Sequence, residues 1–213
     1  MLARRALHAI HVTALGLWSG SLLMTAAMAA VTFPTMKSLA PMLPGYAGYT
    51  GDHWMIAAGK VANTAFAISD GVQFVCAMLA AGSLLVAAVF AGLNWRRPGV
   101  VVRAVIMGSA LGVLAYHLLV LSPRMAVNLR QYWLLAEAGK TSDAEAVRAA
   151  FTADHPTAST VMATLAGLSL IGLILGALAG ADGGPERAEP QPAPAPRLET
   201  PALLRQGGGG GAR

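Results

Sequence analysis

The sequence predicts an all-α fold, an integral membrane four-helix bundle with a short amphipathic helical insertion before the last span and a disordered C-terminal tail. Three observations predict this class. Of 213 residues, 55% are hydrophobic and only 12% are charged, against about 25% in a typical protein. Four apolar runs can each cross a hydrocarbon core about 30 Å thick, which needs about twenty helical residues. The composition then changes abruptly near the C-terminus.

That change divides the chain into a four-span transmembrane domain, residues 1–181, and a tail, residues 182–213, rich in Pro, Ala and Gly. Such a tail cannot bury enough apolar surface to offset the entropy lost on ordering, so we expect disorder. The single cysteine, Cys76, lies inside an apolar run. It can form no intramolecular disulfide.

The net charge of +5 would raise the question of nucleic-acid binding in a soluble protein. Here the basic residues lie mostly in short loops and tails, without a basic stripe interleaved with aromatics. We therefore expect a lipid bilayer as partner and no nucleic acid. The arginines near the N-terminus and in the Asn94–Gly99 connection indicate a multi-pass protein of the cell inner (plasma) membrane with both termini cytoplasmic. The reverse orientation is the alternative, because the two longer loops also contain Arg and Lys.

The first span is expected from Ala9 to Pro34, a stretch without formal charge. Gly16 and Gly20 form a G-x-x-x-G step that would let a neighbouring backbone approach closely. Residues spaced three or four apart share one face, and here they are His8, His11, Leu15, Trp18 and Leu22. Arg4, Arg5 and the small residues 27–29 also resemble a secretory signal, but the apolar run is too long for one, so we interpret it as an anchor.

Residues 35–60 contain several prolines and glycines and are expected to form an irregular connection. Its aromatics, Tyr46, Tyr49 and Trp54, are typical of a membrane–water interface. An interfacial lead-in to Ser69 would then precede a second span, Gly71 to Leu93, with Asp70 and Gln73 at the boundary.

Pro98 is placed to start the third span, Val100 to Leu121. This span contains a second G-x-x-x-G step at Gly108 and Gly112, and Pro123 is expected to end it. The apolar stripe from Met125 to Ala138 predicts a helix along the membrane surface.

Gly139 would cap that surface helix. A capping box at residues 142–145 predicts a short helix to about Ala153. The fourth span, Ala158 to Ala181, follows, with one smooth face formed by Gly172, Gly176 and Gly180.

Ionisable residues inside spans are expensive and often functional. Four would lie near the outer interface: His53, Asp70, His117 and His155. Imidazole and carboxylate groups suit Cu, Zn or Fe. The alternative is that His117 and Asp70 hydrogen-bond between helices while His53 is solvated. Arg124 would either pair with Asp70 or anchor to lipid headgroups.

His11 is interpreted as an interhelical hydrogen-bond donor, with ligand binding as the alternative. No nucleophile elbow, phosphate-binding loop or zinc protease motif is present, so the chain is expected to lack catalytic activity. The expected role is accessory, through a membrane protein partner or a homo-oligomer, or related to small-solute transport. No cofactor is expected. The alternative is a metal- or haem-binding membrane protein, with copper or haem bound.

Several short motifs resemble the domain of unknown function 4149 family, which includes proteins like transmembrane protein 205. They are His11 with Leu17–Gly20, Phe33-Pro34, the segment Leu121–Met125 with Leu129-Arg130, and Phe151 with His155. The opening pattern also looks like copper-resistance D proteins and the membrane protoporphyrinogen oxidase. The resemblance implies an integral membrane bundle with His11, Trp18, Gly20, Pro34, Pro123, Arg124 and His155 as motif residues, and little about chemistry.

Overall fold

The structure, a computed structural model, describes residues 2–90 and 96–181. These residues form helices and turns without any strand, which confirms the all-α class. Asn94, Trp95 and the tail from residue 182 lie outside the described residues, so the disorder of that tail stays a prediction. The elements in order are α1 (Leu2–Leu39), η1 (Pro44–Tyr46), α2 (His53–Phe90), α3 (Pro98–Tyr116), η2 (His117–Leu121), α4 (Ser122–Glu137) and α5 (Thr141–Ala181).

Four long apolar helices dominate the fold, because η2 joins α3 and α4 into one continuous rod from Pro98 to Glu137. The four are 38 to 40 residues long, which at 1.5 Å per residue is about 60 Å. A hydrocarbon core is only about 30 Å thick. The chain is therefore a multi-pass integral membrane protein whose helices continue well beyond the lipid.

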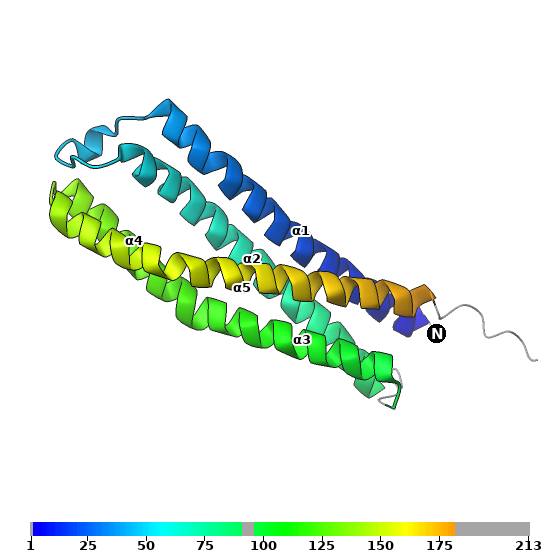
Figure 1. The fold of residues 1–213 in the computed structure, drawn as a ribbon. Coiled ribbons are helices and arrows are strands. Elements are labelled where there is room, and N and C mark those ends of the chain that lie inside the picture. Colours follow the sequence, from blue (N-terminus) through cyan, green and yellow to red (C-terminus); the bar gives the residue numbers. More distant parts are fainter. Residues whose placement is uncertain (1, 91–95, 182–213) are drawn as a thin grey trace, which may run out of the picture. The chain divides into compact units, whose positions relative to one another are not determined.

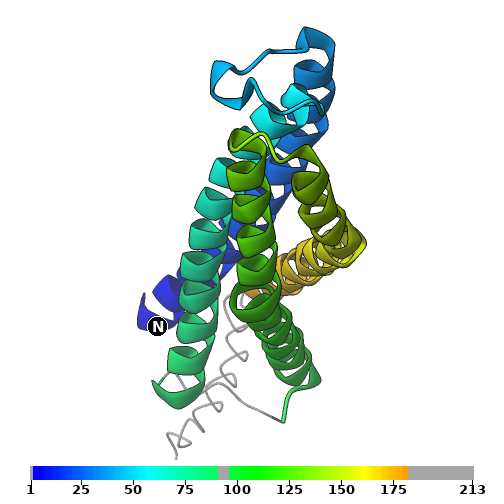
Figure 2. The same cartoon turned by 90° about the vertical axis from the view of Figure 1, so that its left-hand side faces the viewer.

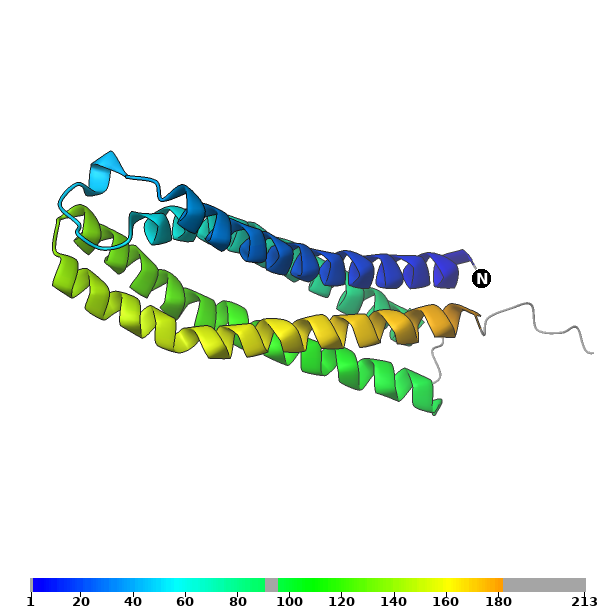
Figure 3. The ribbon, with the colours of Figure 1, turned by 45° about the horizontal axis from the view of Figure 1, so that its top comes forward.

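Neighbouring helices run antiparallel (Figures 1 and 3). α1 and α2 contact each other extensively, α5 contacts α1, α3 and α4, and α2 touches α3 over only a short stretch. The α1–α2 connection and the α4–α5 turn lie at the same end of the bundle (Figure 2). The beginning of α1 and the end of α5 lie at the opposite end (Figure 1).

The prediction of an irregular connection over residues 35–60 is largely wrong. α1 continues through Pro34 to Leu39, and α2 already begins at His53. An internal proline removes one backbone hydrogen bond, but helices in membranes tolerate it because neighbouring groups satisfy the freed carbonyl. Only residues 40–52 are irregular, apart from the short η1 turn.

The predicted end of the third span at Pro123 is wrong as well, and so is the predicted separation between a short helix ending near Ala153 and the fourth span from Ala158. Pro123 lies directly after η2, inside the continuous rod from Pro98 to Glu137, and Pro156 lies inside α5. As at Pro34, neighbouring groups can satisfy the carbonyl that the missing N–H of proline leaves free. The stripe after Pro123 therefore does not lie along the membrane surface. It continues the axis of α3 and packs on α5, and the expected short helix and last span are one helix.

Two helix boundaries agree with the sequence. Pro98 starts α3, and Gly139, with φ +72°, follows α4. Beyond it, the Lys140 N–H donates to the Leu135 carbonyl over 2.9 Å, as in a Schellman cap. The predicted capping box is absent, because α5 starts at Thr141 and the Glu145 carboxylate binds Tyr49 and Arg148 instead.

The buried side chains form two separate cores. One lies in the membrane-spanning part and consists of residues from α1, α2, α3, η2 and α5, among them Trp18, Leu114 and Leu165. The other lies at the end where the two connections meet, which we call the head and define as residues 35–60 and 124–156. Its core is Tyr46, Tyr49, Ile56, Tyr132, Ala136 and Ala144. Tyr46 and Tyr49 are thus buried among protein side chains, and their predicted place at a membrane–water interface stays a prediction.

Candidate functional site: a buried Asp–His pair

Asp70 is an acidic residue inside the membrane-spanning part. Exposed apolar residues flank it on α2, among them Ile68 and Val72. Lys60, the nearest charged residue toward the head on the same helix, lies about 15 Å away along the axis. A carboxyl group at this depth is costly unless it is paired.

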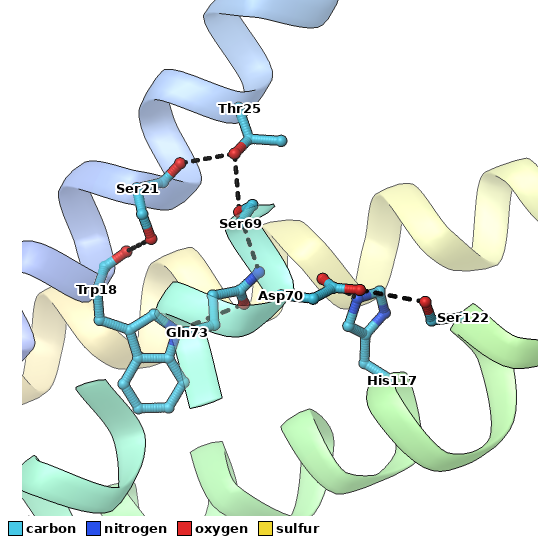
Figure 4. A network of polar contacts seen from close by, with 8 residues as sticks. All are labelled: Trp18, Ser21, Thr25, Ser69, Asp70, Gln73, His117 and Ser122. Atoms are coloured by element: carbon cyan, nitrogen blue, oxygen red, sulfur yellow. Dashed lines mark hydrogen bonds and ion pairs between the residues drawn. The ribbon is translucent and has the colours of Figure 1, made fainter. Parts of the chain in front are cut away.

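The partners of Asp70 come from the opposite helix rod (Figure 4). His117 Nε2 lies 2.9 Å from Asp70 Oδ1, and the Ser122 hydroxyl donates to Oδ2 over 3.1 Å. The hydrogen bond between His117 and Asp70 that the sequence suggested is therefore confirmed. These bonds cross the α2–α3 seam, where the helices otherwise touch over only a short stretch.

A π-helical turn makes this arrangement possible. His117 begins η2, and the backbone N–H of Ser122 donates to the His117 carbonyl. In an α-helix, side chains five residues apart point about 140° away from each other. The wider turn lets both side chains reach the same carboxylate. π-turns are rare, and many lie at functional sites.

One nitrogen of the pair lacks a partner. His117 Nδ1 is buried and has no hydrogen-bond partner within the described chain, and the side chain is 8% exposed. Nε2 is hydrogen-bonded to the carboxylate. Nδ1 therefore either has a free lone pair, if the ring is neutral, or carries a proton, if the ring is an imidazolium. A buried polar atom without a protein partner is uncommon, and it leaves this nitrogen able to form one further hydrogen bond.

Next to the pair, further polar bonds hold α1 against α2 (Figure 4). Thr25 donates to Ser69 over 2.8 Å. Gln73 donates to Ser69 over 3.3 Å and accepts from the Trp18 indole over 3.4 Å. Trp18, predicted as a motif residue, is fully buried. These bonds fix the helix that presents Asp70.

His11 lies nearer the opposite end of the bundle. Its Nδ1 donates to the Ala80 carbonyl of α2 over 2.9 Å, which confirms the interhelical hydrogen bond expected from the sequence. Its Cδ2 lies 3.6 Å from the position that a Cβ on Gly176 would take, and the residue is 4% exposed. A haem at His11 would require α1 and α5 to separate.

The remaining candidate residues, His53, His155 and Arg124, are not hydrogen-bonded or ion-paired to Asp70. His53 is buried in the head, so the prediction that it is solvated is wrong. His155 is exposed and its ring contacts Phe151. Arg124 does not pair with Asp70 but with Asp154, at 2.6 Å, because the continuous α4 carries it past the carboxylate. Among the described residues, no three His, Cys, Asp or Glu side chains come together as a metal site would require.

The glycine faces divide into two kinds. Gly172 and Gly176 of α5 pack closely on Leu15 and Val12 of α1, as the smooth face predicted. No atom lies within 4 Å of the position that a Cβ would take on Gly20, Gly108 or Gly112. The predicted close approach of a backbone at Gly20 and along the 108–112 step is therefore absent within the described part of the chain.

The head contains a second polar network. The Tyr49 hydroxyl donates to Glu145 and lies 3.1 Å from the Tyr132 hydroxyl, and Glu145 also pairs with Arg148. Burial raises the pKa of the Tyr49 hydroxyl above its ordinary value, and the hydrogen bond to Glu145 raises it further. The network ties the α1–α2 connection to α4 and α5.

Sequence reasoning missed two parts of these sites. Ser122 was expected only to end a span, and nothing in its local sequence signals a π-turn. The residues of the head network are spread over three elements, so only their tertiary proximity reveals them. Asp70 and His117 were accessible to prediction, because ionisable residues stand out inside apolar runs.

Together, the fold and this site define a class: a multi-pass integral membrane protein with an Asp–His pair buried between its helices. Comparison with protein-family models, curated proteins and solved structures finds no match for the chain. The resemblance to the domain of unknown function 4149 family therefore stays a prediction.

Proposed function

We propose that the protein has a small-solute transport-related role without catalytic activity, and that the Asp70–His117 pair is its protonation site. The observation that carries this proposal is the unpartnered Nδ1 of His117 beside an ionisable carboxyl group in the membrane-spanning part. Carboxylate–histidine relays in membranes commonly carry protons. The pair bridges a sparsely packed helix seam, so a change in its protonation would act where the bundle is easiest to open.

Proteoliposomes containing a pH-sensitive dye test this proposal. A pH step would be applied alone and with Na⁺, K⁺, Zn²⁺, acetate or glycine on one side. Proton entry faster than in empty liposomes is expected for the wild type, and Asp70→Asn should reduce it to the background rate. Ser19→Ala is the matched control, because Ser19 bonds Ser169 inside the bundle but cannot ionise. Background rates for the wild type under every condition would refute the proposal.

We further propose the inner membrane as location, with both termini cytoplasmic. In the sequence, the two terminal segments, the connection before α3 and the beginning of α3 carry nine Lys and Arg residues, against six in the head. An excess of Lys and Arg of this kind marks the cytoplasmic side. Reporter fusions at Arg97 and Gly139 should report opposite compartments. Fusions reporting the same compartment would contradict the four-span topology, and reversed signals would contradict the orientation.

An accessory role through helix–helix association is the second candidate. Gly108 and Gly112 are exposed and have no neighbour at the Cβ position, so this G-x-x-x-G face is free to pack against another helix. Native mass spectrometry in a mild detergent tests it. We expect an oligomer or a co-purifying protein in the wild type, lost in Gly108→Leu/Gly112→Leu and kept in the control Gly82→Leu. A monomeric wild type would exclude this role.

A further inference from the structure

Both ring nitrogens of His53 form hydrogen bonds, one as a donor and the other as an acceptor. Its Nε2 lies 2.9 Å from the Tyr49 carbonyl, which can only accept, so Nε2 carries a proton. Its Nδ1 lies 3.0 Å from the backbone N–H of Leu43, which can only donate, so Nδ1 carries a lone pair. These two bonds require the neutral imidazole with its proton on Nε2.

The two bonds hold the irregular connection between α1 and α2. Leu43 packs against the head core, and the Tyr49 ring lies 5.9 Å from the His53 ring between centroids. Ala40, at the start of the connection, has a positive φ of 44°, which is strained for a residue other than glycine. The connection therefore stores strain that its contacts, including the His53 bond to Leu43, must balance.

Solvent can reach this histidine although the residue is only 7% exposed. A hollow of about 330 Å³ is lined by residues 40–42 and 49–54, which include His53. The hollow thus brings the medium close to His53 while the head stays folded. A proton added at Nδ1 would point an N–H at the N–H of Leu43 and remove the acceptor of that bond.

The charged and titratable groups around His53 come from each neighbouring element. Tyr49 and Asp52 lie on the connection itself, and Lys37 of α1 reaches the ring of the adjacent Trp54. Lys60 of α2 lies over the Tyr46 ring. From α4 and α5, Tyr132, Glu145 and Arg148 join Tyr49 in the head network. In the part of the chain that the structure describes, none of them forms an ion pair with the His53 ring.

We propose that His53 is a pH-sensitive latch: protonation of its Nδ1 releases Leu43 and loosens residues 40–48 from the head. A histidine ring can take up a second proton when the pH falls, so acidification is the signal. The latch is separate from the Asp70–His117 pair, and it depends neither on transport activity nor on the proposed orientation.

Hydrogen exchange of the full chain in lipid nanodiscs, read by mass spectrometry at pH 8 and pH 5 and corrected for intrinsic rates, tests the latch. In the wild type, protection of residues 41–48 should fall about tenfold at pH 5, because the Leu43 bond to His53 is lost together with the neighbouring contacts of the connection. His53→Gln offers a donor and an acceptor but takes up no proton, so its protection should not change with pH. His155→Gln, an exposed histidine in the same head, should behave as the wild type does.

Equal protection of residues 41–48 at both pH values in the wild type would overturn the latch. The latch would also be overturned if residues 41–48 of His53→Gln lost as much protection at pH 5 as those of the wild type. If His53→Gln is already unprotected at pH 8, ¹⁵N NMR of histidine-labelled wild type decides. Protonation of His53 Nδ1 over the pH range in which residues 41–48 loosen would support the proposal, and protonation outside that range would refute it.

Discussion

The cores of the head and of the membrane-spanning part are held together by different interactions. In the head, water drives apolar side chains together, and the core is built from large residues such as Tyr46, Ile56 and Tyr132. In lipid, helices gain no such drive and associate through close contact and hydrogen bonds. There, small residues such as Ala77 and Ala80 are fully buried, and Thr25–Ser69 and Ser19–Ser169 bonds join the helices. Stability should therefore respond differently to similar substitutions in the two regions.

The largest effect is expected from breaking the buried pair in the membrane-spanning part. His117→Leu would leave the Asp70 carboxylate with Ser122 as its remaining partner, and removing a hydrogen-bond partner from a charged group in an apolar site costs more than the about 3 kcal/mol of a neutral group. Thermal unfolding followed by circular dichroism in nanodiscs measures the loss. The double substitution Asp70→Leu/His117→Leu should recover most of it, and a double variant as unstable as the single one would contradict the explanation.

Matched truncations compare the two cores directly. Ile56 of the head and Leu165 of the membrane-spanning part are both fully buried. Ile56→Ala should cost about 3 kcal/mol, since it loses both transfer and cavity terms. Leu165→Ala should cost about half as much, because lipid removes the transfer term. Equal losses in the free energy of unfolding would show that the two regions are stabilised alike.

A smaller effect is expected for the Tyr49 hydroxyl in the head. Its pKa is raised above the ordinary 10.0, so the folded state keeps the proton that the unfolded state loses. This contribution to stability is complete below pH 10 and declines as the pH rises above it. Melting temperatures between pH 8 and 11 should fall less steeply in Tyr49→Phe than in the wild type. Tyr116→Phe, at an exposed site, should leave the slope unchanged.

The smallest effect is expected at the surface of the head. The Arg124 side chain is 51% exposed in its ion pair with Asp154, and exposed pairs contribute roughly 0 to 1 kcal/mol. Arg124→Ala should therefore lower the free energy of unfolding by less than about 1 kcal/mol, and the loss should shrink in high salt. A loss comparable to that of Ile56→Ala would show that Arg124 holds the head together.

The sequence predicts the membrane-spanning part better than the head. Apolar runs, the start at Pro98 and the stop at Gly139 are local signals, and each of them was interpreted correctly. Asp70 and His117 could be paired from topology alone. The head could not be foreseen, because Pro34, Pro123 and Pro156 signal breaks that the surrounding tertiary structure makes tolerable. The partner of Arg124 followed from that error, since a helix assumed to end at Pro123 cannot carry Arg124 toward Asp154.

The π-turn at η2 has a consequence for the whole second half of the molecule. It holds one residue more than an α-helical turn would, and one residue corresponds to about 100° of rotation about the helix axis. Without it, the face of α4 that carries Tyr132 and Ala136 would turn away from the head core. The register of the distant head is thus set within the lipid, at the histidine that contacts Asp70. Any rearrangement that converted this π-turn into a regular α-helical turn would rotate α4, and with it the head, about the helix axis.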